Sequence, residues 1–327
     1  MKVAILHSEL AKDAGKDELD VLEQIKLVRE ALNKMGAASC TVPISLDIDQ
    51  ALDALKKSKA DVVFNLVESL NGIGKFVFMA PAFLDHLQIP YTGGHTEAMF
   101  ITTGKVLSKQ MLKSFNLPTP AWQTDYDILH NGLQLDPPCI IKPVWEDASV
   151  GLDDDSVLDK KDNVNRFIKE KIKRFGDCFA EEYIHGREFN LSILGGQGGT
   201  VQLMPAAEIV FTDYPPGKPH IVGYQAKWHE DSFEYCNTVR NFDFPDSDKA
   251  LLQKMAELAE QCWNIFNLRG YARVDFRIDS DNNPWILEIN ANPCIAPDSG
   301  FIAASQRAGL DNQTVIKRII TDALDNY

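Results

Sequence analysis

The sequence predicts an α/β protein with a parallel sheet near its N-terminus and antiparallel strands near its C-terminus. Apolar runs at residues 2–7, 40–44 and 61–67 alternate with helical patterns, which is the order of a βαβαβ unit. Residues 271–290 instead show two period-two runs joined by a polar turn, which predicts an antiparallel hairpin. These observations together predict a mixed fold with both kinds of sheet.

Composition and charge exclude several classes of protein. The chain has 327 residues and a formal net charge of -14, and it has no block of Lys and Arg, so a nucleic-acid-binding protein is not expected. Its apolar runs are shorter than the roughly 20 residues of a membrane span, and no signal peptide precedes the first strand, which predicts a cytoplasmic protein. The six cysteines form no C-x-x-C pair, so neither zinc nor a disulfide framework is expected.

The N-terminal unit is expected to bind a ligand at one edge of its sheet. After the first strand, apolar residues recur on one helical face that ends at Gly36: Leu19, Leu22, Ile25, Val28, Leu32 and Met35. Ligands of parallel sheets lie at the carboxyl ends of the strands, so segment 68–74, directly after the third strand, is expected to contact one. No G-x-G-x-x-G motif follows the first strand, so the usual dinucleotide-binding fold is not expected.

A linker and a small α+β lobe are expected next. A helix over residues 102–115 leads into the proline-containing linker 117–120. Lys142 then interrupts an apolar strand, where a lysine needs an anionic partner or a path to solvent. The loop 145–151 has the small residues of a phosphate-cradling loop, although most such loops are ordinary turns. The rest of the lobe is predicted as a helix over 162–174 and strands over 179–184 and 188–194.

The C-terminal part is expected to contain a lid. Residues 212–235 are polar and lack a clear period, and loops of this length are usually functional lids or disordered. The aromatic residues around Lys227 favour a lid that packs against another part of the molecule over a disordered segment. The flanking elements are predicted as a strand over 199–211, a helix over 247–266, a loop over 291–300 that Asp298 or Ser299 ends as a helix cap, and a last helix over 313–324.

The hairpin places polar side chains on one face. If Asp281 and Asn282 are the central residues of a tight turn, Asp275 lies opposite Glu288. By the same register Arg273 lies opposite Asn290, and the apolar residues of both strands point to the other face.

Two interpretations of this polar face are open at this point. In the first, Arg273 and Arg277 neutralise two facing carboxylates on an ordinary solvated surface. In the second, Asp275, Glu288 and Asn290 offer oxygen ligands that converge on a hard cation such as Mg²⁺.

The order of several short motifs carries a resemblance over nearly the whole chain. They are Asp61-Val-Val-Phe-Asn65, Ile89-Pro-Tyr-Thr-Gly93, Ile141-Lys-Pro143, Ser149-Val-Gly151, Gly186-Arg-Glu188, Tyr224-Gln-Ala-Lys227, Arg273-Val-Asp-Phe276 and Leu287-Glu-Ile-Asn290. With this set the chain resembles the ATP-grasp superfamily and, within it, the D-alanine–D-alanine ligases. The resemblance implies an N-terminal parallel α/β domain over 1–104, a central α+β lobe over 105–186 and a C-terminal α+β domain with an antiparallel sheet over 187–327.

The resemblance also implies cofactors and site residues. ATP would bind with Mg²⁺, for which Mn²⁺ is an alternative, and the metal ligands would be Asp275, Glu288 and Asn290. The residues at the phosphates would be Lys105, Lys142, Ser149 and Lys227, and those around adenine and ribose would be Glu181, Glu182, Ile184 and Glu188. Arg273 would face the tetrahedral centre, the backbone N–H of Cys294 would occupy the oxyanion position, and Ser299 would bind the carboxylate of the amine substrate.

The activity implied by the resemblance is ATP-dependent joining of a carboxylate to an amine through an acylphosphate. Amino acids or peptides would be the substrates, and the chain would form a homodimer. Loading of an amino acid onto a larger amine or carrier is one alternative, and a non-catalytic ATP-binding module is another.

Departures from the family pattern gather where the first substrate would bind. The chain has Ala148 in place of the first serine of a pair, Trp228 in place of a tyrosine and Cys294 in place of a glycine. Segment 68–74 replaces a His-Gly segment, and Glu18 is the candidate for an N-terminal glutamate. The expectation is therefore a changed donor substrate, with D-alanine as the alternative.

Overall fold

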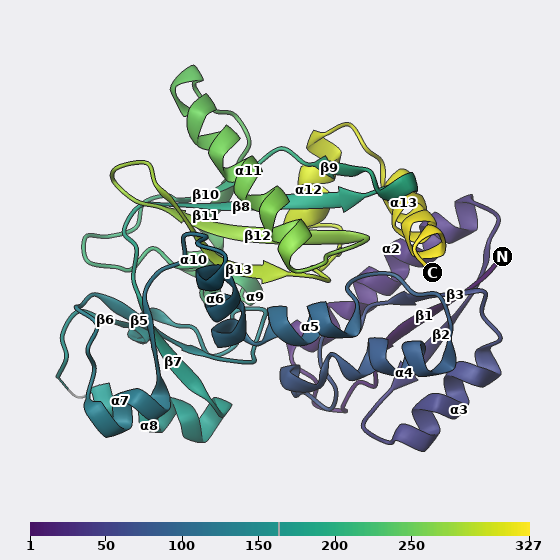
Figure 1. Cartoon of the computed structure of the whole chain (residues 1–327), viewed down its shortest axis with the longest axis horizontal. Helices are drawn as coiled ribbons and strands as arrows, with labels where there is room; N and C mark the ends of the chain where they lie inside the picture. Colours follow the sequence, from purple (N-terminus) through teal and green to yellow (C-terminus); the bar gives the residue numbers. More distant parts are fainter. Residues whose placement is uncertain (163) are drawn as a thin grey trace.

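Three sheets are arranged around a common centre in the computed structural model, which describes residues 1–162 and 164–327. In Figure 1 a three-stranded sheet lies at the lower right, a four-stranded sheet at the lower left, and a six-stranded sheet above both. The predicted mixture of parallel and antiparallel sheets is confirmed. The division into domains at residues 104 and 186 stays a prediction.

The N-terminal sheet is parallel, with the strand order β2 (Ala38–Ile44), β1 (Lys2–Ser8) and β3 (Val62–Asn65). Helix α2 (Val21–Lys34) covers one face, while α3 (Ile48–Ser58) and α4 (Met79–Leu87) cover the other. This arrangement confirms the predicted βαβαβ unit. Strands β1 and β3 are buried because both of their faces are covered, whereas β2 at the edge of the sheet keeps several exposed residues.

The predicted apolar face of the first helix is wrong at its start. Leu19 and Leu22 are 43% and 47% exposed, whereas Val21 and Ile25 are buried. The short helix α1 (Lys16–Leu19) ends before α2 begins at Val21, with Asp20 between them. The break shifts the helical phase, so that residues before and after it no longer share a face.

The four-stranded sheet is antiparallel and carries its own small core. Its order is β4 (Trp122–Thr124), β7 (Cys178–Glu182), β5 (Cys139–Pro143) and β6 (Val157–Leu158). Helices α7 (Asp125–Asn131) and α8 (Val164–Phe175) pack on it. Residue 163 falls within the predicted helix 162–174 and lies outside the described residues.

The six-stranded sheet holds the hairpin. Its order is β11 (Thr238–Asn241), β10 (Ala207–Phe211), β8 (Arg187–Gly195), β12 (Tyr271–Ile278) and β13 (Pro284–Asn290), and β9 (Val201–Leu203) pairs with β8. The single strand predicted over 199–211 is wrong, because β9 and β10 are separate. Pro205 lies in the break, where it has no N–H group to donate to a ladder.

Helices join the sheets and cover them. Helix α11 (Lys249–Ile265) packs on the large sheet, and α12 (Gly300–Arg307) and α13 (Asn312–Asp325) follow the hairpin. Helices α5 (Thr96–Thr103) and α6 (Lys105–Ser114) pack against β13, and α5 lies between the N-terminal unit and the large sheet (Figure 1). Short 3-10 turns lie at Gly74–Phe76, Asp154–Ser156, Gln197–Gly199 and Asp246–Asp248.

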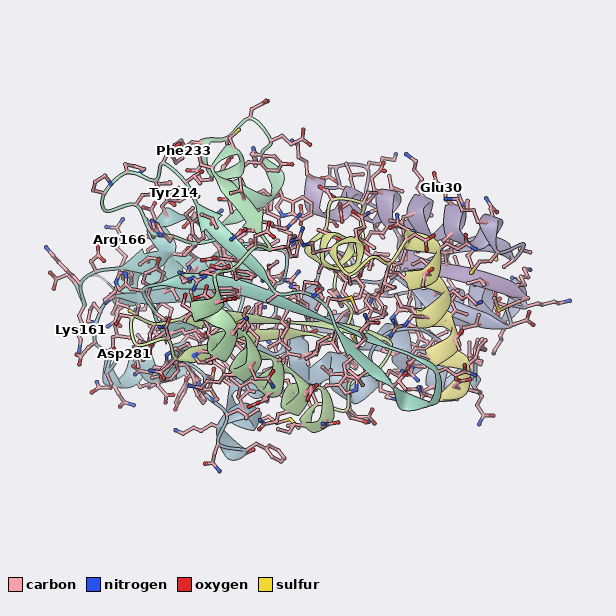
Figure 2. The ribbon with its side chains drawn as sticks, turned by 90° about the horizontal axis from the view of Figure 1, so that it is seen from above. Glu30, Lys161, Arg166, Tyr214, Phe233 and Asp281 are labelled. Carbon is pink, nitrogen blue, oxygen red and sulfur yellow. The ribbon has the colours of Figure 1, made fainter. Side chains whose placement is uncertain are left out.

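The expected lid contains two short helices, α9 (Tyr224–Trp228) and α10 (Phe233–Cys236). The ring centroids of Phe233 and Tyr214 are 5.4 Å apart. Figure 2 labels both residues at the upper left. Within the described residues, the helices are too short or too polar to cross a membrane.

Candidate active site

The hairpin has the predicted register but a different turn. Asp275 pairs with Glu288 across β12 and β13, and Arg273 pairs with Asn290. The predicted two-residue turn is wrong: the paired strands stop at Ile278, and a longer loop over residues 279–283 connects them. The side chain of Asp279 stabilises this loop, since its Oδ1 accepts from the backbone N–H groups of residues 281 and 283 at 3.0 and 2.8 Å.

A β-bulge at Leu287 restores the register that the longer loop would have shifted. Phe276 pairs with Ile286 while Asp275 pairs with Glu288, so Leu287 has no opposite residue. As a result Ile286 is fully buried in the core, and Leu287 turns toward the same cavity as Glu288. The expectation that Leu287 belongs to the core face is therefore wrong.

The residues predicted to hold ATP, the metal and the reacting centre line one cavity of about 790 Å³, whose wall comes from the four-stranded sheet, the six-stranded sheet and the segment after β3. The predicted residues in its wall are Lys105, Lys142, Ser149, Glu181, Glu182, Ile184, Glu188, Lys227, Arg273, Asp275, Glu288, Asn290, Cys294 and Ser299. Glu68, Ala148 and Trp228, at which the chain departs from the family pattern, line it as well. The cavity therefore brings together residues from positions 20 to 300 of the chain.

The carboxylate of Asp275 accepts hydrogen bonds from three neighbours. Arg273 donates to it through both Nε and an Nη atom at 2.7 Å, which is a forked ion pair. Asn190 on β8 donates to Oδ1 at 2.7 Å from the next strand of the sheet. Asn290 Nδ2 lies 3.4 Å from the other carboxylate oxygen.

Glu288 is ionised beside several cations. Burial alone would raise the pKa of its carboxyl group, but the positive charges nearby, that of Lys105 foremost, lower the pKa to about 2. Its Oε2 lies 3.7 Å from the Nζ of Lys105. The donor set of Asp275, Glu288 and Asn290 consists of carboxylate and amide groups, and their oxygens are the ligands that Mg²⁺ prefers.

The lysines of the cavity have acidic partners. Lys105 Nζ lies 2.7 Å from Asp147 Oδ1 and donates to the Glu146 carbonyl at 2.7 Å. Lys142 meets Glu181 at 2.6 Å, which supplies the anionic partner that its apolar strand required. Lys109 also reaches Glu181, at 2.5 Å.

The loop after β5 is hydrogen-bonded to the lid. Ala148 and Ser149 have positive φ angles of 56° and 63°, a conformation that is uncommon for residues with a Cβ atom. Ser149 Oγ donates to the Val222 carbonyl at 2.7 Å, and Trp228 Nε1 donates to the Ala148 carbonyl at 2.8 Å. Lys227 Nζ lies 5.1 Å from the ring centroid of Trp228, at the wall of the cavity.

The wall expected to hold adenine and ribose is partly apolar and partly charged. Ile184 is buried, while Glu182 is exposed at the rim. Glu188 is buried in an ion pair with Arg277 at 2.9 Å. Burial raises the pKa of Glu188, and Arg277 opposes the shift.

The far end of the cavity is acidic. Asp20, Glu68 and Cys294 each offer one atom within 4.8 Å of the other two. Gln24 Nε2 donates to Glu68 at 2.8 Å and to Asp20 at 3.2 Å, and Cys294 Sγ donates to Asp20 at 3.0 Å. Burial raises the pKa of Glu68 to about 7.

Glu18 is a wrong candidate for this end. Its carboxylate accepts from the backbone N–H of Gly15 at 3.0 Å and so caps helix α1, whereas Asp20 lines the cavity.

Three further residues at or behind the cavity were not predicted from the sequence. Lys109 follows Lys105 by four positions on one helix, and this spacing puts both on one face. Asn190 follows Glu188 by two positions on a strand, so the alternation could have indicated it. Asp20 sits at the break between two helices and gave no such signal.

Comparison with known proteins then decides the family. The family model described as "D-ala D-ala ligase C-terminus" matches residues 115–321. The chain belongs to the D-ala D-ala ligase C-terminal family. The expected ATP-grasp fold and the expected ATP-grasp ligase class are thereby confirmed.

Relatives of this family match nearly the whole chain. The D-alanine–D-alanine ligase of Aquifex aeolicus is 27% identical over 300 residues, which cover 90% of this chain and 93% of that one. The D-alanine–D-alanine ligase of a Synechococcus strain is 27% identical over 310 residues, 91% of this chain and 87% of its own. The structure of D-alanine–D-alanine ligase from Bacillus anthracis complexed with ATP has a TM-score of 0.74, 17% identity, and coverage of 99% and 97%, and it shows that the fold is shared.

Proposed function

We propose that the protein is an ATP-dependent carboxylate–amine ligase that forms a peptide or amide bond through an acylphosphate. One observation carries the proposal: a single cavity joins a facing carboxylate pair, Asp275 and Glu288, to Arg273 and to the lysines of three different elements. Family membership supplies the reaction class that fits these groups.

Mg²⁺, or Mn²⁺ in its place, would be held by Asp275, Glu288 and Asn290. The fit rests on their oxygen ligands, and Glu288 is kept ionised by its neighbours. When bound, the metal supplies neutralisation of phosphate charge.

The residues of the chain would bind ATP and stabilise its transferred group. Lys105 and Lys142 would contact phosphates, and Ser149 with its neighbouring backbone would cover them. Lys227 would approach the γ-phosphate from the lid. The residues for adenine and ribose would be Glu181, Glu182, Ile184 and Glu188. A closed lid keeps water away from an acylphosphate, and the contact between Trp228 and Ala148 supports such closure.

The bond changes balance without a nucleophilic side chain. A substrate carboxylate oxygen takes the γ-phosphoryl group and ADP leaves; the amine then attacks the carbonyl carbon, inorganic phosphate leaves, and the amine nitrogen loses a proton. Arg273 suits the tetrahedral oxyanion because its guanidinium stays charged and donates in a fork. The backbone N–H of Cys294 would assist it, and Ser299 would bind the carboxylate of the amine substrate.

The donor substrate is proposed to differ from the one that the family pattern implies. Ala148 and Trp228 remove two hydroxyl groups from the cavity wall, and Cys294 places a thiol there. Asp20 and Glu68 add carboxylates at the same end, which favours a donor with an ammonium group. A site loses orders of magnitude for a substrate whose hydrogen-bond partners are absent.

The alternatives are weaker. A carrier with an acidic surface would require a basic docking face, and the net charge of -14 disfavours one. A non-catalytic ATP-binding module would not need Arg273 beside the carboxylate pair. A cytoplasmic homodimer stays a prediction.

The test is phosphate release from ATP across a panel of D- and L-amino acids, with product mass measured by mass spectrometry. Turnover that depends on one pair of substrates supports the ligase and identifies the donor. ATP binding without turnover on any pair supports the module instead, and strong turnover with D-alanine alone contradicts the changed donor.

A further inference from the structure

A buried ion triad lies behind the nucleotide end of the cavity. The side chains of Lys109 and Glu181 are 0% and 1% exposed, and that of Lys142 is 14% exposed. Their charged atoms meet at 2.5 Å between Lys109 and Glu181 and at 2.6 Å between Lys142 and Glu181. Glu181 and Lys142 line the cavity, and Lys109 lies behind them. The proposed reaction so far gives Lys109 no part.

The local structure fixes each member of the triad. Ile140 of β5 pairs with Glu181 of β7, so Glu181 and Lys142 are diagonal neighbours on one face of the sheet. Lys109 comes from helix α6, and its Nζ also donates to Thr119 Oγ1 at 2.7 Å and to the Pro120 carbonyl at 3.3 Å. Lys109 is thus fixed by two hydrogen bonds to the linker, and its ammonium group forms an ion pair with Glu181.

The charges of the triad add up to one excess positive charge. A buried carboxylate is costly unless it is paired. Burial would raise the pKa of Glu181, but the two lysines outweigh burial and lower it, so the carboxylate stays ionised. With Lys142 as its single partner, Glu181 would cancel the charge of Lys142. The second lysine removes that cancellation.

We infer that Lys109 is a positioning residue for nucleotide binding, because it neutralises Glu181 from behind and leaves the positive charge of Lys142 for an anionic ligand in the cavity. The inference rests on the proposed function, in which that ligand is a phosphate group of ATP. Lys142 uses one of its three N–H donors on Glu181, which leaves two for the phosphate.

The experiment compares the binding of ADP and adenosine by isothermal titration calorimetry in the presence of Mg²⁺. The ratio of the two affinities isolates what the phosphates contribute. In Lys109→Met the ratio is expected to fall by roughly tenfold, which is the size of one weakened charge-assisted hydrogen bond. In the double variant Lys109→Met/Glu181→Gln the excess positive charge returns, and the ratio is expected to recover to within about twofold of the wild-type value.

Lys113→Met is the matched control. Lys113 lies one turn further along α6, is exposed, and contacts Trp122 as Lys109 does, with Nζ to ring-centroid distances of 5.6 and 5.7 Å. Its ratio should equal that of the wild type.

An unchanged ratio in Lys109→Met overturns the inference, and so does a reduced ratio that the double variant fails to restore, because a purely structural role predicts no rescue. If Lys109→Met does not fold, the double variant decides in the same way. A wild-type protein that binds neither ATP nor ADP contradicts the proposed function rather than the role of Lys109.

Discussion

The two ends of the cavity handle charge in opposite ways. At the nucleotide end the acids and bases are paired: Arg273 with Asp275, Lys105 with Asp147, and Glu181 with two lysines. At the far end Asp20 and Glu68 share an amide and a thiol as neighbours, and the pKa of Glu68 rises to about 7. Paired charges suit a ligand such as ATP with Mg²⁺, in which the metal ion neutralises part of the phosphate charge. Unpaired carboxylates suit a ligand that is itself cationic.

The largest effect is expected from breaking the nucleotide end. Asp275→Asn should lower turnover by at least about a hundredfold, since it removes a charge from the cation site and releases Arg273. Phosphate release measures the effect, and far-UV circular dichroism checks the fold. Asp281→Asn in the exposed loop of the same hairpin is the control; Figure 2 shows Asp281 at the end of the molecule opposite Glu30. Turnover of Asp275→Asn within tenfold of wild type would remove the metal assignment.

The far end should impose a pH dependence on stability. The pKa of Glu68 is raised from 4.5 to about 7 in the folded protein, so its contribution to stability is fully present below pH 4.5 and is lost as the pH rises through about 7. Between pH 5 and pH 8 the wild type should therefore lose up to about 3 kcal/mol of its free energy of unfolding relative to Glu68→Gln, which has no carboxyl group to ionise.

Urea unfolding at both pH values measures this difference. Glu288→Gln is the contrasting variant from the nucleotide end. The pKa of Glu288 is lowered to about 2, so its contribution to stability falls away only as the pH drops toward 2. This variant should keep the wild-type slope between pH 5 and pH 8. Equal slopes in wild type and Glu68→Gln would refute the contrast between the two ends.

A smaller effect is expected at the lid that joins the two ends. Trp228→Phe removes the hydrogen bond to the Ala148 carbonyl and should raise the KM for ATP about fivefold, the equivalent of about 1 kcal/mol. Trp285→Phe is the control, because it also removes an indole hydrogen bond, the one that Trp285 Nε1 donates to Asp279 at 2.9 Å. This bond lies in the hairpin loop and not in the lid. A KM that changes equally in both variants would argue against a specific closing contact.

The smallest effect concerns Tyr271, which lies beside the acidic end. Its hydroxyl is buried without a hydrogen-bond partner among the described residues, so Tyr271→Phe should leave the free energy of unfolding unchanged or raise it by about 1 kcal/mol. Tyr91→Phe should instead lower it by about 1 kcal/mol, because Tyr91 donates to Asp85 at 2.7 Å. A clear loss of stability in Tyr271→Phe would show that the hydroxyl has a partner.

Local patterns predicted the elements well where one period ran without interruption. The alternation along β12 and β13 predicted that Asp275 faces Glu288, and residues 247–266 gave helix α11. The prediction failed where a single residue resets the phase, as Asp20 does before α2 and Pro205 does between β9 and β10.

The residues of the site as a whole could not be predicted from such local patterns. The resemblance, rather than any period, indicated which side chains share the cavity. Lys109 and Asp20 stayed hidden because their partners come from distant elements: β7 for Lys109, and the segment after β3 for Asp20. Sequence spacing along one element does not encode such contacts.

The bulge at Leu287 separates the chemistry of the hairpin from the length of its tip. Asp275 pairs with Glu288 on the cavity side of the bulge. Next to the bulge, the backbone N–H of Ile286 donates to the Pro118 carbonyl of the linker at 2.9 Å, which fixes strand β13 at this point. We expect the bulge to absorb a change in loop length at residues 279–283 before it reaches Glu288. We therefore expect that an affinity peptide grafted at the tip leaves the pairing of Asp275 with Glu288, and hence turnover, unchanged.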